Sequence, residues 1–347
     1  MSSPTRYSQR LGAITDAQFA AVARRFRLGR FVGAAPITSG LFGQNVFVTT
    51  TAGEFVLRGA PHWVKGSSDT QWRQEDRWQF TKERFFARQL HERTQAPVPW
   101  PMLHDESSDI LGWPYLVMPR MPGQCFDERS ILKSLPPVDR RAVAAALGAM
   151  LAQMQQLTWP FSGDFSVTSI ALEPYPSGTT QQVIADTHSK VAMAAGHGAM
   201  TDDDRAWIDA AVVQAQAARG SRPCTFVHCD YKLNNLTVAN AGNGWHVSGV
   251  FDLHEARFAD GAQDIVRQAC SYLDTEPELA RVFAERYFAQ VAPDSRIREL
   301  MPLYVVNDRM KFWEFFTRPD ARAAWSMGKT FRGWAERYMQ GVLGLLG

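Results

Sequence analysis

The stretch Thr225–Asp264, TFVHCDYKLNNLTVANAGNGWHVSGVFDLHEARFADGAQD, holds the most informative arrangement of polar residues in the chain. β-Branched and aromatic residues flank a polar segment that begins at His228, which is typical of a loop held between strands. Asp230 and Asn235 lie in this loop, and Asp252 follows the next strand-like run. Because a hairpin returns the chain to the loop, we expect these side chains to face one cavity.

The residue types in this loop suit the chemistry of a phosphoryl group. Carboxylate and amide oxygens are ligands of Mg²⁺, which proteins usually hold with one or two carboxylates plus substrate phosphates. An aspartate that lies beside the metal without binding it can accept a proton from a hydroxyl nucleophile. Lys232 adds a positive charge that can offset the charge of a phosphoryl group during transfer.

The motif HCDYKLNN, followed by VFD and ADGAQD, resembles the catalytic loop and metal-binding aspartate of protein-kinase-like enzymes. It is most similar to the aminoglycoside phosphotransferase family, with its signature H-G-D-x-x-x-x-N, then a hydrophobic residue and Asp, and later G-D-x-x-x-D. The resemblance implies that Asp230 is the catalytic base and that Asn235 and Asp252 hold Mg²⁺. It also implies that His228 and Asp264 brace the loop.

Two positions depart from the family signature. Cys229 occupies the place of the usual glycine, and we expect this small change to be tolerated. Lys232 stands two residues after the aspartate, as in many protein kinases, and the resemblance implies that it stabilises the transferred phosphate.

The segment TSGLFGQNVFV, residues 38–48, resembles the glycine-containing loop that closes over the phosphates of ATP. The resemblance implies that the backbone near Gly40 and Gly43 approaches the nucleotide, together with Ser39 and Phe42. Two glycines in a hairpin are also common in ordinary turns, so this assignment depends on the other motifs.

In the next strand-like run, EFVLRGAP, Arg58 occupies the place where many kinases carry a phosphate-contacting lysine. Arginine can pair with phosphate through two parallel hydrogen bonds, so the same role is open to it. Lys65 is an alternative cation, and Glu83, on the following predicted helix, is the expected partner that positions Arg58.

The run YLVMPRMPG resembles the hinge of a kinase. The resemblance implies that the carbonyl of Pro119 and the N–H of Met121 meet the adenine edge, with Met118 behind it. A proline at this place removes only a donor that the contact does not use.

Hydrophobic periodicity predicts an α+β chain with a strand-rich first part and a helical second part. The family resemblance implies that these parts form a protein-kinase-like bilobal fold. We expect a small strand-rich nucleotide-binding lobe over residues 1–120. Residues 121–347 are expected to form a larger helical lobe with one short β-element, catalytic loop 228–235 and the acceptor site. Predicted helices cover residues 16–26, 74–93, 136–157 and 201–217, the last with Thr201 as N-cap, and predicted strands lie near residues 46–57, 97–105 and 113–123.

Composition narrows the class of protein. The chain has 347 residues, 45% of them hydrophobic, and a formal net charge of +2, which gives no global attraction to nucleic acid or anionic membranes. Its four cysteines form no C-x-x-C pair, and the N-terminus has no signal-like apolar run. These features predict a cytoplasmic protein with no nucleic-acid or membrane partner, and they leave a monomer and a homodimer equally open.

Together these features predict an ATP-dependent kinase that phosphorylates a hydroxyl of a small molecule and uses Mg²⁺, with GTP left open as donor. The alternative is a nucleotide-binding pseudokinase or scaffold, motivated by Arg58 in place of lysine. A protein kinase is disfavoured because only eleven residues separate Asp252 from Asp264. The C-terminal aromatic residues Trp313–Tyr338 are predicted to be helix-packing core, with a binding box for a flat or cationic substrate as the alternative.

Overall fold

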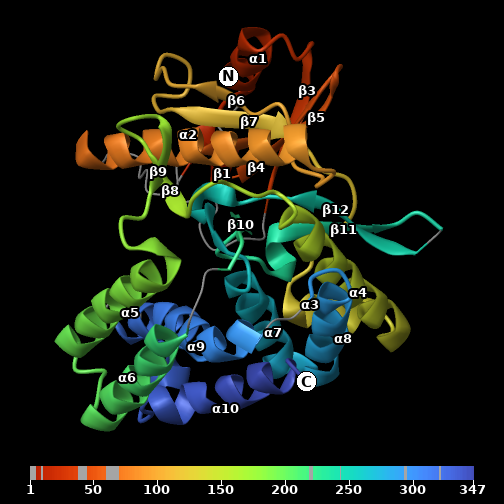
Figure 1. Ribbon diagram of the computed structural model, residues 1–347. Helices are drawn as coiled ribbons and strands as arrows, with labels where there is room; N and C mark the ends of the chain where they lie inside the picture. The colour runs from red at the N-terminus through yellow and green to blue at the C-terminus, as the bar shows by residue number, and fades with distance from the viewer. Residues whose placement is uncertain are drawn as a thin grey trace.

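The structure is a computed structural model, and it describes residues 5–8, 11–37, 45–59, 70–218, 222–242, 244–292, 295–319 and 322–347. A small antiparallel sheet and one long helix lie at one end of the molecule, and a larger group of helices lies at the other (Figure 1). The predicted division into a strand-rich part and a helical part is therefore confirmed. The described part of the chain contains no helix long and apolar enough to cross a membrane.

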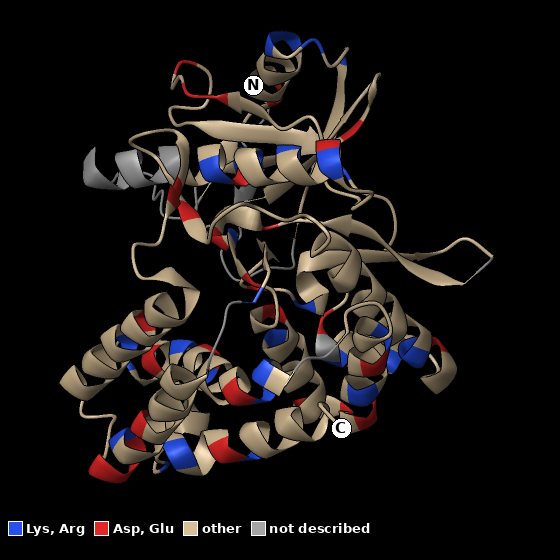
Figure 2. Cartoon of the chain, viewed as in Figure 1, with Lys and Arg blue, Asp and Glu red and all other residues tan. Residues whose placement is uncertain are grey.

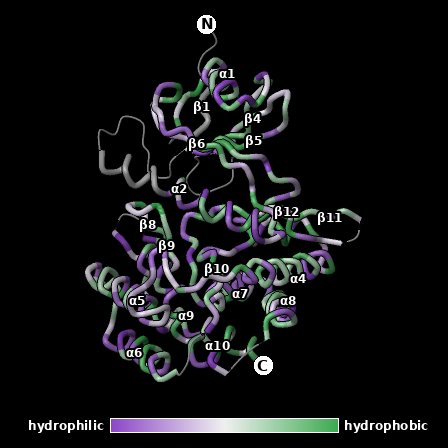
Figure 3. Tube along the Cα trace, turned by 45° about the horizontal axis from the view of Figure 1, so that its top comes forward, coloured by the Kyte–Doolittle hydropathy of each residue, from purple (hydrophilic) through white to green (hydrophobic). Residues whose placement is uncertain are grey.

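The small part is built on a five-stranded sheet in which all neighbouring strands are antiparallel. Its order is β3 (Phe31–Pro36), β4 (Asn45–Thr50), β5 (Gly53–Gly59), β7 (Tyr115–Pro119) and β6 (Leu103–Asp105). Hydrophobic residues follow one another along these strands (Figure 3). Strand β3 was not predicted, because FVGAAP contains too few large apolar residues to alternate clearly.

Strand β7 shows why this sheet is buried on both faces. Tyr115 and Val117 belong to a cluster with the apolar face of helix α1 (Asp16–Arg25). Leu116 and Met118, which alternate with them, belong to the cluster that contains the buried residues of helix α2 (Thr70–Arg93). Successive strand side chains point to opposite faces, so a continuous apolar run covers both. A two-stranded sheet of β1 (Thr5–Ser8) and β2 (Gly12–Ile14) precedes α1.

The large part contains eight helices among the described residues. They are α3 (Glu128–Ser134), α4 (Pro137–Met154), α5 (Gly178–Gly196), α6 (Asp202–Ala217), α7 (Gln263–Thr275), α8 (Pro277–Phe288), α9 (Ser295–Thr317) and α10 (Phe331–Gly344). The predicted N-cap of α6 is confirmed, since Thr201 Oγ1 accepts from the N–H of Asp204 at 3.1 Å.

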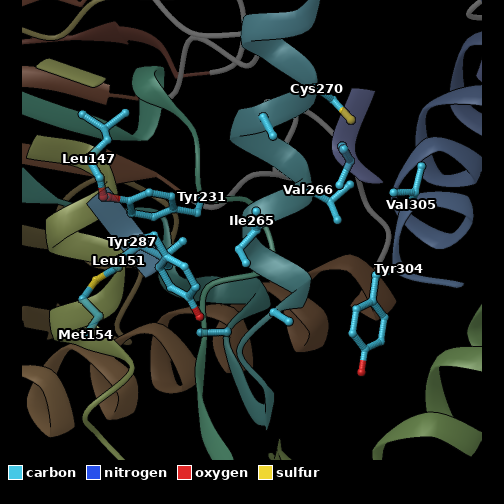
Figure 4. Close-up of a cluster of buried hydrophobic side chains, with 14 of the residues drawn as sticks. Leu147, Leu151, Met154, Tyr231, Ile265, Val266, Cys270, Tyr287, Tyr304 and Val305 are labelled. Atoms are coloured by element: carbon cyan, nitrogen blue, oxygen red, sulfur yellow. The ribbon is translucent and has the colours of Figure 1, made fainter. Parts of the chain in front are cut away.

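Tyr231, from the loop before β11, packs among α4, α7 and α8 (Figure 4) and donates its hydroxyl to Leu147 O at 2.8 Å. The loop between β10 and β11 is therefore anchored in the core formed by these helices.

Two small sheets lie between the main sheet and the helices, where one short β-element was expected. The first is the predicted hairpin of β11 (Leu236–Asn240) and β12 (Trp245–Val250). The second has the order β10 (Cys224–Val227), β13 (Arg257–Asp260), β8 (Gly163–Ser166) and β9 (Ala171–Pro174). The expectation of one element was wrong because β8 and β9 have only four residues each, too few for a periodic signal.

Most of the C-terminal aromatic residues pack into the core, as predicted, whereas Phe315 is 36% exposed. Trp313, Phe331, Trp334 and Tyr338 are all less than a tenth exposed and stack on one another. The guanidinium of Arg309 lies 4.8 Å from the centre of the Tyr338 ring, so a cation of the chain itself already occupies a face of this cluster. The alternative of a substrate box at this place is not supported.

Gly148 on α4 tests how closely α4 and α8 pack. A Cβ atom at this position would lie 2.2 Å from the carbonyl oxygen of Phe283 on α8. We expect Gly148→Ala to lower the free energy of unfolding by about 1–3 kcal/mol through overpacking, although alanine favours helix by about 1 kcal/mol. Urea denaturation measures the difference. The control is Gly196→Ala on α5, where nothing lies within 4 Å and stability should not fall. Equal effects of the two substitutions would contradict the close approach.

Candidate active site

The loop between β10 and β11 brings Asp230 and Asn235 together. The Nδ2 amide of Asn235 donates to the carbonyl oxygen of Asp230 and to its Oδ2, each at 2.9 Å. A short 3-10 turn, Leu233–Asn235, places the asparagine there, and the N–H of Leu233 donates to Gln268 Oε1 at 2.7 Å. Although the two residues are five positions apart in the sequence, the side chain of Asn235 thus lies directly against the Asp230 carboxylate.

Asp264, at the start of α7, holds the beginning of the same loop. Its carboxylate accepts from the N–H of His228 at 2.6 Å and from the N–H of Cys229 at 2.8 Å. Asp264 is 1% exposed, and burial raises its pKa above the usual value of an aspartate. Both oxygens of this carboxylate therefore accept hydrogen bonds from the backbone of the loop.

The imidazole of His228 connects the loop to the strand that precedes Asp252. Its Nε2 lies 3.0 Å from the carbonyl oxygen of Phe251, and the N–H of Asp230 donates to its Nδ1 at 3.3 Å. Because Nδ1 accepts, Nε2 carries the hydrogen, which corresponds to the neutral tautomer with the proton on Nε2. His228 thus acts on the position of Asp230 through the backbone.

Two residues of the site have left-handed backbone conformations. Cys229 has φ 66° and Asp252 has φ 67°. Non-glycine residues pay about 1–2 kcal/mol for this region, and only glycine adopts it freely. Glycine therefore suits the place that Cys229 occupies, and cysteine adopts the same left-handed conformation there with local strain. At Asp252 the same geometry turns the chain from β12 into the loop that leads to β13.

Arg58 on β5 links the main sheet to this loop. Its Nη1 donates to Glu83 Oε1 on α2 at 3.0 Å, and its Nη2 donates to Asp252 Oδ1 at 2.7 Å. Arg58 is 6% exposed and Glu83 only 1%. Burial on its own raises the pKa of Asp252, but the charge of Arg58 outweighs it and holds that pKa well below the usual range. Sequence analysis predicted the pairing of Arg58 with Glu83, and the contact with Asp252 was not foreseen.

Asp230 is also surrounded by cations. Lys232 Nζ lies 2.8 Å from Asp230 Oδ2, and Arg267 Nε on α7 lies 3.4 Å from Asp230 Oδ1. Burial raises the pKa of Asp230, yet the charges of Arg267 and Lys232 prevail and lower it. The sequence motifs did not point to Arg267. Its spacing of three residues from Asp264 is the signal that could have done so, because it places both residues on the same face of α7. Its other partner is Asp308 on α9, at 2.9 Å.

Asn235 and Asp252 present oxygens that suit Mg²⁺. Since Nδ2 of Asn235 donates to Asp230, its Oδ1 is the atom able to coordinate a cation. Arg58 and His254 both contact Oδ1 of Asp252, which leaves its Oδ2 for a metal. The backbone joins the two residues, because the N–H of Phe251 donates to Asn235 O at 3.2 Å. One amide and one carboxylate fit a Mg²⁺ that is held partly by phosphates.

The structure describes only some of the residues that were predicted to contact the nucleotide. The glycine-containing loop with Ser39, Gly40, Phe42 and Gly43, and the alternative cation Lys65, fall outside the described residues. In the predicted hinge, Met118 is buried and Pro119 is the last residue of β7. Met121 packs beside Gly249 of β12, where an added Cβ would meet its side chain at 2.6 Å. The segment predicted to be the hinge therefore packs beside the hairpin that precedes Asp252.

A cavity of about 600 Å³ opens beside the loop, between the main sheet and the helices. Charged residues of both signs gather around this region (Figure 2). The residues that line it come from both parts of the chain: Arg58, Gln79, Lys82, Asp164, Asp186, Lys190, Cys229, Asp252, His254, Glu255, Arg257, Gln263, Arg267, Tyr304, Asn307, Asp308 and Lys311. Most were not singled out in the sequence, because they come from separate elements with no shared motif.

A sheet with its buried Arg–Glu pair, a loop with Asp and Asn, and a following Asp define the class of kinase-like phosphotransferases. Residues 33–300 match the family model described as "Phosphotransferase enzyme family". The chain belongs to this family, which confirms the resemblance seen in the sequence.

Solved structures with the same fold cover nearly the whole chain. A Ralstonia eutropha JMP134 protein with a provisional assignment as an aminoglycoside phosphotransferase has 14% identity over 96% of this chain and 98% of its own, with a TM-score of 0.62. An aminoglycoside phosphotransferase variant in complex with ADP and hygromycin B has 17% identity over 93% and 96%, with a TM-score of 0.59. A streptomycin–ATP complex has 15% identity over 96% of each chain and a TM-score of 0.53. The comparison with curated protein sequences gave no match.

Replacing Asp264 by asparagine tests the brace of the loop. The amide keeps one oxygen but turns a donor toward one of the two backbone N–H groups, so we expect a loss of about 1–3 kcal/mol in the free energy of unfolding. Urea denaturation measures this loss. Asp209→Asn, an exposed position on α6, is the matched control and should change stability by less than about 0.5 kcal/mol. Equal stability of the two variants would show that Asp264 does not hold the loop.

Proposed function

We propose that this chain transfers the γ-phosphoryl group of ATP to a hydroxyl group of a small molecule. The observation that carries the proposal is the Asp230 carboxylate, which Asn235 and Lys232 hold in place. Asp252 lines the cavity beside this loop, and so does Arg267, which contacts Asp230. The family supports phosphotransfer, and relatives bound to ADP, ATP, hygromycin B or streptomycin support a nucleotide and a hydroxyl-bearing acceptor.

In this mechanism, Asp230 accepts the proton of the acceptor hydroxyl while the hydroxyl oxygen attacks the γ-phosphorus in line. The bond from the γ-phosphorus to the bridging oxygen breaks, and ADP leaves. Lys232, 2.8 Å from Asp230, and Arg58 offset the negative charge that spreads over the transferred group. The lowered pKa of Asp230 keeps it ionised and ready to accept a proton at neutral pH.

Mg²⁺ would supply charge neutralisation and hold the nucleotide phosphates, with Asn235 Oδ1 and Asp252 Oδ2 as its protein ligands. Arg58 orients Asp252 for this role by binding its other oxygen. In the proposed division of the chain, residues 1–120 carry the nucleotide side, with Met118, Pro119 and Met121 at the adenine. Residues 121–347 carry the base and the acceptor.

The second candidate function is a nucleotide-binding pseudokinase. Arg58 in place of lysine motivates it, since the guanidinium already pairs with Glu83 and Asp252 and is less available for a nucleotide phosphate. The two functions differ in one measurable property, because the pseudokinase binds nucleotide without turnover that an acceptor stimulates.

The first experiment is Mg²⁺-dependent ADP release from purified protein, with ATP or GTP and a panel of hydroxyl-bearing acceptors. Asp230→Asn should leave the affinity for AMP-PNP nearly unchanged and lower acceptor-stimulated turnover by at least about 100-fold, because the general base is lost. Asp209→Asn is the matched control. Wild-type turnover in the Asp230 variant would refute the assignment of the base, and binding without turnover in the wild type would favour the pseudokinase.

Asp252→Ala tests the metal ligand. Without this carboxylate, Mg²⁺ should no longer strengthen nucleotide binding, and we expect a loss of about tenfold or more in the Mg²⁺-dependent part of the affinity. Titration calorimetry with ATP, with and without Mg²⁺, measures it. If the variant gains as much affinity from Mg²⁺ as the wild type, Asp252 is not a ligand.

A further inference from the structure

The cavity beside Asp230 carries a mixed set of charges that is not predominantly acidic. Its cationic side chains are Arg58, Lys82, Lys190, Arg257, Arg267 and Lys311. Its anionic side chains are Asp164, Asp186, Asp252, Glu255 and Asp308. A polycationic acceptor would bind best in a cavity with more carboxylates than cations. In this cavity the carboxylates do not outnumber the cations.

Five of the six cations already contact a carboxylate of the chain. Arg58 contacts Glu83 and Asp252, and Lys82 contacts Asp164 at 2.6 Å. Three further pairs complete the set: Lys190 with Asp186, Arg267 with Asp308, and Lys311 with Glu255.

Arg257 on β13 is the exception. Its Nη2 donates to the neutral amide of Gln263 at 2.9 Å, and the hydroxyl of Tyr175 lies close enough to interact with it electrostatically. Its Nε is buried and has no hydrogen-bond partner in the part of the chain that the structure describes. Asp164 and Asp186 influence it, but neither forms an ion pair with it within 4 Å. A guanidinium in this setting is a strong site for an anion, because carboxylate and phosphate match its planar set of donors.

The position of Arg257 connects it to the reaction. It pairs across the sheet with Val227, the residue before His228, and Cys229 lines the same cavity. We propose that Arg257 binds an anionic group of the acceptor, so that the substrate is a hydroxyl compound that carries a carboxylate or a phosphate. The proposal rests on the proposed function and names the substrate class of that site. Asp164 and Asp186, each paired with a lysine, remain available to bind hydroxyl groups of the same molecule.

The test compares acceptors that differ only in the anionic group. D-Gluconate is paired with D-sorbitol, and glucose 6-phosphate with glucose, so the two arms separate a carboxylate from a phosphate. We expect ADP release to be stimulated more by one of the anions than by its uncharged counterpart. Arg257→Gln should raise the KM of that anion about 10- to 100-fold and leave the KM of ATP unchanged. Arg257→Lys, which keeps the charge, should recover part of the loss.

Arg88→Gln removes the same charge from an exposed position on α2 and should leave all values unchanged. An equal effect of Arg257→Gln on charged and uncharged acceptors would overturn the proposal, as would an increase in the KM of ATP. Preference for an uncharged or polycationic acceptor such as kanamycin would overturn it too.

Calorimetry in saturating Mg²⁺ and AMP-PNP separates this proposal from the proposed function. If no acceptor stimulates turnover, the proposed function fails, and binding of gluconate or glucose 6-phosphate then decides the fate of the anion site. Binding that weakens tenfold or more in Arg257→Gln supports the site. Absence of binding, or equal binding by the variant, overturns it.

Discussion

The arrangement of the site depends on the contact of Arg58 with both Glu83 and Asp252. This one guanidinium joins a strand of the main sheet, the helix beside it and the loop after β12. Burying a charge is expensive unless partners surround it, and removing one partner of a buried pair typically costs about 3–5 kcal/mol. The relative position of the two parts of the chain is therefore tied to the ionised state of Asp252, the same group that is proposed to bind the metal.

The loop that carries Asp230 shows how hydrogen bonds support a strained backbone. Cys229 and Asp252 both adopt left-handed backbone conformations that side chains disfavour. Asp264 accepts the N–H groups of His228 and Cys229, so the helix α7 holds the first turn. Tyr231, buried among α4, α7 and α8, anchors the same loop from below. Local strain persists because the surrounding contacts leave the loop no alternative conformation.

The sequence motif that identifies the family does not contain most of the charged residues that line the cavity. Asp230, Asn235 and Asp252, the residues proposed as base and metal ligands, lie in one stretch of sequence, whereas Lys82, Lys190, Arg257 and Lys311 come from α2, α5, β13 and α9. Each of these cations is unremarkable in its own segment. Only their convergence shows that most are neutralised and that Arg257 is not. The proposed preference for an anionic acceptor therefore depends on ion pairs between distant segments, and no sequence motif shows these pairs.

The sequence by itself determined the α+β division of the chain, because strand alternation and helical periodicity are local properties. The resemblance of the HCDYKLNN, VFD and ADGAQD motifs gave the family and the kinase-like fold, and their spacing predicted that Asp230, Asn235 and Asp252 lie near one another. The sequence also predicted the partner of Arg58 and the N-cap at Thr201. It missed β3 and the sheet of β8 and β9, whose segments are short or poor in large apolar residues. The tertiary structure alone decided the second contact of Arg58, the approach of Arg267 to Asp230 and the setting of Arg257. These contacts join residues far apart in the chain, and the packing of whole elements, not local spacing, fixes their distances.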